Sequence, residues 1–173
     1  MIQIQFEKAP PVADTPLEHL TACHRRIEQR LDIFERAGAA LEQSPEAALV
    51  AIANSIRFMD HSGALHTVDE EESVFPRMRA SLSQSEIEYL DKLEAEHRKA
   101  EELYHRLKDA AAALHSGVTA ERAAAYREIA SELGALYRGH IASEDAMLVE
   151  LGKRAFTSAD LESIQSEMRA RRT

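Results

Sequence analysis

Four histidines at inward positions of helix-like segments are the residues of this sequence best suited to chemistry. A helix brings residues i, i+3, i+4 and i+7 to one face. By this spacing His24, His97 and His140 share faces with leucine, isoleucine, methionine or tyrosine, and His66 lies on a mixed face that includes small residues. One histidine on an apolar face is usually a core residue, but four in successive segments would each need a buried hydrogen-bond partner. A shared metal site would satisfy all four imidazoles together.

Acidic residues follow histidines by four positions more often than chance predicts. About 1.4 such pairs are expected at this acid content, and the sequence contains five: His24/Glu28, His66/Glu70, His97/Glu101, His105/Asp109 and His140/Glu144. Pairs at i,i+4 also stabilise surface helices, which is sufficient reason for His105/Asp109. In His66/Glu70 and His140/Glu144 both members face inward, and a buried carboxylate without a partner is costly. The neighbouring acids Asp69, Glu71 and Glu72 are interpreted as the solvated rim of the site or as partners of its ligands.

Imidazoles from four segments and carboxylates from two of them predict a metal site with mixed nitrogen and oxygen ligands. Six such ligands favour a di-iron pair over zinc, which rarely needs so many, although other divalent metals are compatible. A ferritin-type site places Glu-x-x-His on two different helices. Here both matches, Glu94/His97 and Glu102/His105, lie in one segment. That type of site is therefore disfavoured.

The segments that must position these residues are predicted to be helices. Start signals occur at Thr15-Pro16, Ser44-Pro45, Ser83 or Ser85, Thr119 and Ser158. The expected helices run from there to about Glu42, to Phe75, to Ser116-Gly117, through Leu151 and to about Ala170. Pro76 is expected to kink or end the second helix.

Four long amphipathic helices with short connections predict an all-α protein with an up-down-up-down four-helix bundle. We expect an extended N-terminal arm at residues 1–14, where Pro10 and Pro11 forbid a helix, the bundle at 15–156, and a short fifth helix packed on it at 157–173.

Composition excludes several classes of partner. The chain has 173 residues and a formal charge of −9, which argues against binding nucleic acid through phosphates. Its basic cluster, Arg169, Arg171 and Arg172, is interpreted as solubilising. The single cysteine, Cys23, cannot form an internal disulfide and is interpreted as a packing residue. Without a signal-peptide pattern or a long apolar run, we expect a cytoplasmic protein with no membrane partner, compatible with a homodimer.

Four motifs, CHRRIEQ, HTVDEEESVFP, EHRKAEEL and HIASEDAML, resemble in order and spacing those of the hemerythrin-like family, the HHE cation-binding proteins. The final segment SADLESIQSEMRARR resembles the additional terminal helix of many bacterial members. The resemblance implies that His24, His66, His97 and His140 bind two irons and that Glu70 and Glu144 bridge them. Oxygen-carrying members place the last acid one residue later, at Asp145, but helical phase favours Glu144.

The third motif departs from the oxygen carriers, which have His-x-x-x-His where this chain has His97 and Glu101. The H, HxxxE, H, HxxxE pattern resembles the branch that includes iron-sulfur cluster repair di-iron proteins, whose cysteine-bearing N-terminal domain has no match here. Glu101 is an additional candidate ligand. Tyr104 and Tyr137, one turn from the motifs, are candidates to donate a hydrogen bond to a bound ligand, although core packing is the commoner role of such tyrosines.

The first functional hypothesis is a non-haem di-iron protein that binds or reacts with oxygen, nitric oxide or peroxide. The second is a metal-dependent iron or redox sensor without turnover. A third, a metal-free helical interaction bundle, would show substoichiometric metal after growth with iron.

Overall fold

A computed structural model describes residues 15–173, except for the side chains of residues 149 and 153. The predicted arm at 1–14 lies outside the described residues. The elements are α1 (Pro16–Ala40), α2 (Pro45–Phe58), η1 (Met59–Gly63), α3 (Ala64–Val68), η2 (Asp69–Val74), α4 (Phe75–Arg79), α5 (Gln84–Leu114), α6 (Ala120–Ala155) and α7 (Ser158–Ala170). The two elements named η are π-helical and run without a break between the α-helices around them.

The helix starts are fixed by local capping contacts. In α1 the Thr15 hydroxyl accepts from the Glu18 N–H, and Glu18 accepts from the Thr15 N–H. Capping boxes of the same kind begin α5 and α7. Each satisfies backbone donors that the first helical turn leaves free. Between α5 and α6, Gly117 adopts φ +123°, a conformation that other residues rarely adopt.

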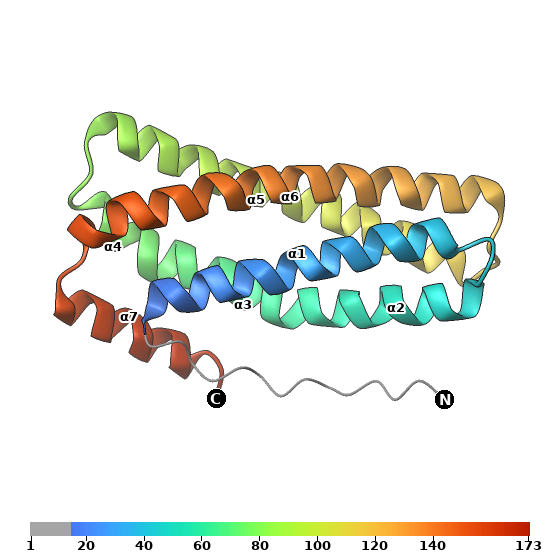
Figure 1. Ribbon diagram of the computed structural model, residues 1–173, viewed down its shortest axis with the longest axis horizontal. Coiled ribbons are helices and arrows are strands. Elements are labelled where there is room, and N and C mark those ends of the chain that lie inside the picture. The colour runs from blue at the N-terminus through green and yellow to red at the C-terminus, as the bar shows by residue number, and fades with distance from the viewer. Residues whose placement is uncertain (1–14) are drawn as a thin grey trace.

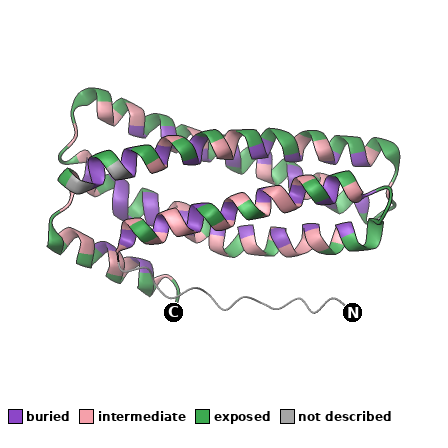
Figure 2. Ribbon diagram, viewed as in Figure 1, coloured by how far each residue is buried: buried purple, intermediate pink, exposed green. Residues whose placement is uncertain are grey.

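The helices form the predicted up-down-up-down bundle. Helix α1 packs against α2 and α6, and α5 packs against α6 and α2, so that consecutive helices are antiparallel neighbours (Figure 1). Helix α7 lies beside the bundle near one end, where it contacts α1 and η2. Buried residues follow the inward faces of the long helices (Figure 2). The predicted all-α fold is confirmed.

The second helix of the bundle differs from the expectation. An end at Pro76 is excluded, because helical structure continues to Arg79. Just before Pro76, the Phe75 N–H donates to the Glu70 carbonyl, five residues back. Proline lacks a backbone donor and its ring needs room in the preceding turn. The wider π turn provides that room, and π segments are frequent at functional sites.

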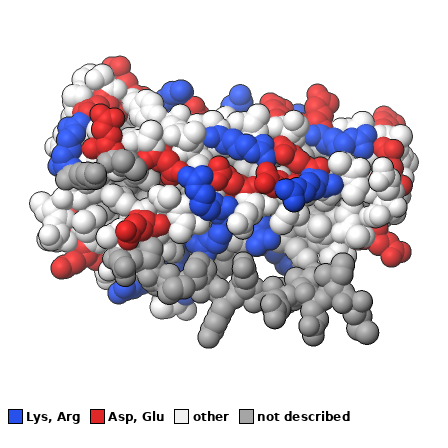
Figure 3. All heavy atoms as spheres, viewed as in Figure 1, with Lys and Arg blue, Asp and Glu red and all other residues white. Residues whose placement is uncertain are grey.

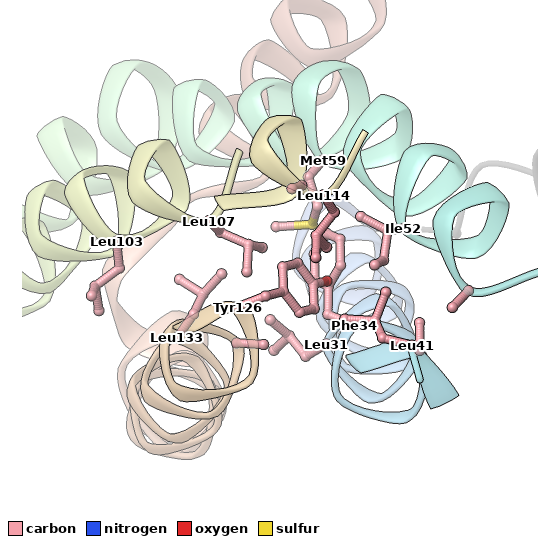
Figure 4. Close-up of a cluster of buried hydrophobic side chains, with 14 of the residues drawn as sticks. Leu31, Phe34, Leu41, Ile52, Met59, Leu103, Leu107, Leu114, Tyr126 and Leu133 are labelled. Atoms are coloured by element: carbon pink, nitrogen blue, oxygen red, sulfur yellow. The ribbon is translucent and has the colours of Figure 1, made fainter. Parts of the chain in front are cut away.

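Two apolar clusters fill the bundle, one at each end. The first includes Leu31, Phe34, Leu107, Tyr126 and Leu133 (Figure 4). The second, near α7, includes Leu20, Phe75, Leu93, Met147 and Ile164. A layer of buried polar residues separates the two clusters along the helices. It consists of His24, His66, Glu70, His97, His140 and Glu144. A polar layer of this kind inside an apolar core requires partners.

The visible surface mixes charges of both signs. Acidic and basic side chains lie next to each other along α1 and α6 (Figure 3). Arg138 of α6, for example, pairs with Asp32 and Glu35 of α1. Within residues 15–173, no helix combines the length and the apolar character that crossing a bilayer would require.

Candidate metal centre

The structure brings the six predicted ligand residues together inside the bundle. His24 comes from α1, His66 from α3, Glu70 from η2, His97 from α5, and His140 and Glu144 from α6. All six are between 0% and 8% exposed. The continuous segment from α2 to α4 forms the second helix of the bundle. Each of the four bundle helices therefore contributes to one buried layer of imidazoles and carboxylates.

Glu70 lies between the two halves of this layer. Its Oε1 is 2.9 Å from His66 Nε2 and 3.5 Å from His24 Nε2. Its Oε2 is 3.4 Å from His97 Nε2. The two oxygens of one carboxylate thus face different histidines, as a carboxylate that bridges two cations requires.

Glu144 occupies the matching position on α6. Its Oε2 is 3.3 Å from His24 Nε2 and 3.3 Å from His140 Nε2. The Nε2 atoms of His97 and His140 are 2.9 Å apart, so both point at the same volume. Two groups of mutually close ligand atoms result, His24/His66/Glu70/Glu144 and His97/His140/Glu144. Glu144 belongs to both groups.

Three of the histidines are oriented by carboxylates on their outer nitrogens. The Nδ1 atom of His24 lies 2.7 Å from Asp145. The Nδ1 atom of His97 lies 2.9 Å from Glu71, and that of His140 lies 3.1 Å from Glu96. Donation of Nδ1–H to a carboxylate leaves the Nε2 lone pair facing inward, and such partners typically accompany metal-binding histidines. The orientation of these rings suits metal ligation.

The charges of the layer are balanced within it. Burial alone would lower the pKa of His24, but the hydrogen bond with Asp145 and the nearby carboxylates of Glu144 and Glu70 raise it to about 12. For His66, burial is likewise outweighed, mainly by the charge of Glu70, and its pKa rises to about 9. The same pairing, chiefly with His66, holds the pKa of Glu70 well below its ordinary value despite burial. Protons on the histidines balance the buried carboxylates here, and a cation would replace them.

Unpartnered atoms show that the residues fit a metal. His24 Nε2 and both carboxylate oxygens of Glu70 and Glu144 are buried without a hydrogen-bond partner among the described residues. Buried polar atoms are normally satisfied. Because all five atoms are potential metal ligands and face one volume, a cation there would satisfy them together.

Two candidate ligands lie outside this volume. The side chain of Glu101 is 72% exposed and its nearest ionic partner is His105, at 3.8 Å. Ala100, three residues after His97, takes the inward position instead and is 3% exposed. Asp145 turns toward the outer nitrogen of His24 and also pairs with Arg25. It therefore orients a histidine and does not face the interior of the layer.

The two tyrosines differ in position. The Tyr104 hydroxyl donates to the Ile56 carbonyl and to Asp60, so it ties α5 to α2 and η1. Burial, followed by the charges of Glu70 and Glu101, raises the pKa of Tyr137 to about 12. Of the two, only Tyr137 is affected by a residue of the buried layer.

Several residues of the site were not predicted individually. Glu96, which lies 3.1 Å from His140 Nδ1, is the first residue of the motif EHRKAEEL but was not singled out, because it does not follow a histidine by four positions. Asp69, expected at the rim or beside a ligand, is fully buried. Cys23 is buried as predicted for a packing residue, and its Sγ accepts from Arg26 Nη2 at 2.8 Å. Opposed by burial, the neighbouring His19 and His66 lower the pKa of this thiol to about 5.

Comparison with protein families agrees with the geometry. The family model described as the hemerythrin HHE cation binding domain matches residues 15–151. This range includes all six residues of the buried layer. Comparison with curated proteins gives no match. The matched segment covers most of the chain, and the chain therefore belongs to the hemerythrin HHE cation-binding domain family.

Proposed function

We propose that this protein is a non-haem di-iron protein that binds or reacts with a small ligand, either a diatomic gas such as oxygen or nitric oxide, or peroxide. The observation that carries the proposal is the pair of overlapping ligand groups, with Glu144 in both and Glu70 facing histidines of both. One cation in each group would be held by these six inward side chains, with Glu70 and Glu144 available to both cations.

The donor set favours iron. Imidazole nitrogen suits iron, copper, nickel and zinc, whereas carboxylate oxygen suits harder cations. A mixture of four imidazoles and two carboxylates in one buried layer is appropriate for iron. When bound, a reduced iron pair supplies two electrons to an oxidant; the role of the chain is to hold, orient and enclose it.

Burial restricts the ligand to a small molecule. The six inward residues are at most 8% exposed, so a large substrate could not reach them. Because Glu101 lies on the surface, no side chain from that turn of α5 adds a further ligand. Coordination positions that the six side chains leave open are thus available to a small ligand. The Tyr137 hydroxyl, whose pKa is raised by burial and by the charge of Glu70, is a candidate donor to that ligand.

Reconstitution tests the proposal. Chelator-treated protein would be loaded with Fe(II) without oxygen, and its optical spectrum recorded before and after addition of oxygen, nitric oxide or peroxide. We expect two irons per chain and new bands with at least one ligand. Glu102→Gln serves as a control because this side chain is exposed on α5, the helix that also carries His97.

Two results would count against the proposal: a wild-type chain that retains no iron, or a loaded protein whose spectrum is unchanged by all three ligands. Repeated consumption of peroxide with a reductant would indicate an enzyme. A spectral response without turnover would indicate the sensor.

A further inference from the structure

The C-terminal arginine cluster is not simply solubilising, because two of its three members pair with a buried acid. Arg171 Nη1 donates to Asp69 Oδ1 at 3.0 Å, and Arg172 Nη2 donates to Asp69 Oδ2. The side chain of Asp69 is fully buried, while those of Arg171 and Arg172 are 19% and 28% exposed. A buried carboxylate without such partners would be strongly unfavourable. Asp69 therefore depends on residues about a hundred positions away in the sequence.

A second set of contacts joins α7 to the same π segment. Arg171 Nη2 also donates to Ser73 Oγ at 2.9 Å. The Ser73 hydroxyl in turn donates to Glu167 of α7 at 2.6 Å. Arg77 binds both Glu167 and the Ser73 carbonyl, at 2.6 Å and 2.8 Å. Helix α7 and the residues after it thus hold η2 at both of its ends.

The segment held in this way carries the bridging carboxylate. Glu70 follows Asp69 directly, and its carbonyl accepts the π-type hydrogen bond from Phe75. A shift of η2 would move Glu70 relative to His66 and His97, which its two oxygens face at 2.9 Å and 3.4 Å. A metal site loses affinity when the residues that orient its ligands are removed, typically tenfold to about a hundredfold.

We propose that Arg171 and Arg172, through Asp69, are positioning residues for Glu70, so that docking of α7 and metal binding stabilise each other. The proposal rests on the metal binding proposed above. Coupling of this kind is reciprocal: a metal in the buried layer should hold α7 more firmly, and loss of the α7 contacts should weaken the metal. Binding of metal in the buried layer would then change how firmly α7 is held at the surface of the protein.

The first experiment compares Fe(II) affinity, measured by competition with a chelator without oxygen, in the wild type and in the Arg171→Gln/Arg172→Gln variant. We expect affinity about tenfold or more weaker in the variant. Arg169→Gln is the matched control, since Arg169 lies exposed in the last turn of α7, and it should bind as the wild type does. In the wild type, bound metal should slow hydrogen exchange of the backbone amides of residues 158–173.

A third variant separates positioning from simple charge compensation. Adding Asp69→Asn to the double variant removes the unpaired buried charge, so the thermal midpoint of the metal-free protein should recover. The metal affinity should stay weak, because no ion pair then joins η2 to α7. Recovery of both properties would overturn the proposal, as would wild-type affinity in a folded double variant. A wild-type protein that binds no metal would instead refute the proposed function itself.

Discussion

The substitution Glu70→Gln separates the two roles that the structure gives to this carboxylate. It keeps the size of the side chain and removes its charge. In the metal-free protein Glu70 balances His66, whose Nε2 is 2.9 Å from Oε1 with both side chains buried. This pairing, together with a smaller contribution from Cys23, outweighs burial and raises the pKa of His66 from 6.5 to about 9. A difference of one pH unit in pKa corresponds to about 1.4 kcal/mol, so the pair contributes about 3 kcal/mol to the free energy of unfolding.

The contribution has a defined pH window. Because the folded pKa of His66 is raised, the stabilisation is complete below 6.5 and is lost as the pH rises through about 9. The folded pKa of Glu70 is lowered. The stabilisation is therefore also lost when the pH falls from 4.5 through that lowered pKa. Between pH 4.5 and 6.5, the free energy of unfolding of the wild type should therefore be about 3 kcal/mol larger than that of the Glu70→Gln variant. The difference should shrink as the pH rises from 6.5 through about 9.

Urea unfolding of chelator-treated protein, followed by circular dichroism from pH 5 to 10, measures this difference. Glu102→Gln, which changes an exposed carboxylate on α5, should unfold as the wild type does. A difference between wild type and Glu70→Gln that is the same at every pH would refute the reasoning, since it would mean that the substitution acts through packing and not through the ion pair.

Three further substitutions test other parts of the site. His140→Ala should reduce iron to one ion per chain or none, whereas His115→Ala, at the end of α5, should leave the content determined by elemental analysis unchanged. Glu101→Gln should alter neither the optical bands nor the iron stoichiometry, because this side chain is on the surface; loss of iron would return it to the ligand set. Asp145→Asn should weaken Fe(II) binding about tenfold to a hundredfold in a chelator competition, because it removes the charge that orients His24. Unchanged affinity there would show that His24 is held by packing alone.

Local patterns were sufficient to predict the helices and most of the site. Capping residues such as Thr15 and Ser83 act within one turn, so the sequence marks helix starts directly. Helical spacing likewise identified His24, His97 and His140 as inward, because each lies among core residues of its own helix; His66, on a mixed face, was the candidate from the second helix. These features depend on neighbours within about four positions.

The remaining features depend on contacts between distant segments. The π turns around His66 and Glu70 change the phase of the helix, which a constant period of 3.6 cannot represent. Asp69 is buried only because Arg171 and Arg172 reach it from beyond α7. In α5, the rotation of the helix turns Ala100 inward and Glu101 outward. A short motif specifies neither the rotation of a helix within the bundle nor the pairing of residues that are distant in the sequence.

Iron content and optical spectrum together test the central claim most directly. Protein purified from cells supplied with iron would be subjected to elemental analysis, beside the double variant Glu70→Gln/Glu144→Gln, which removes the two carboxylate charges proposed to bridge the irons. The account predicts two irons per wild-type chain, absorption bands that change with oxygen, nitric oxide or peroxide, and loss of iron and bands in the variant. Substoichiometric iron in the wild type, or equal iron in both proteins, would contradict it.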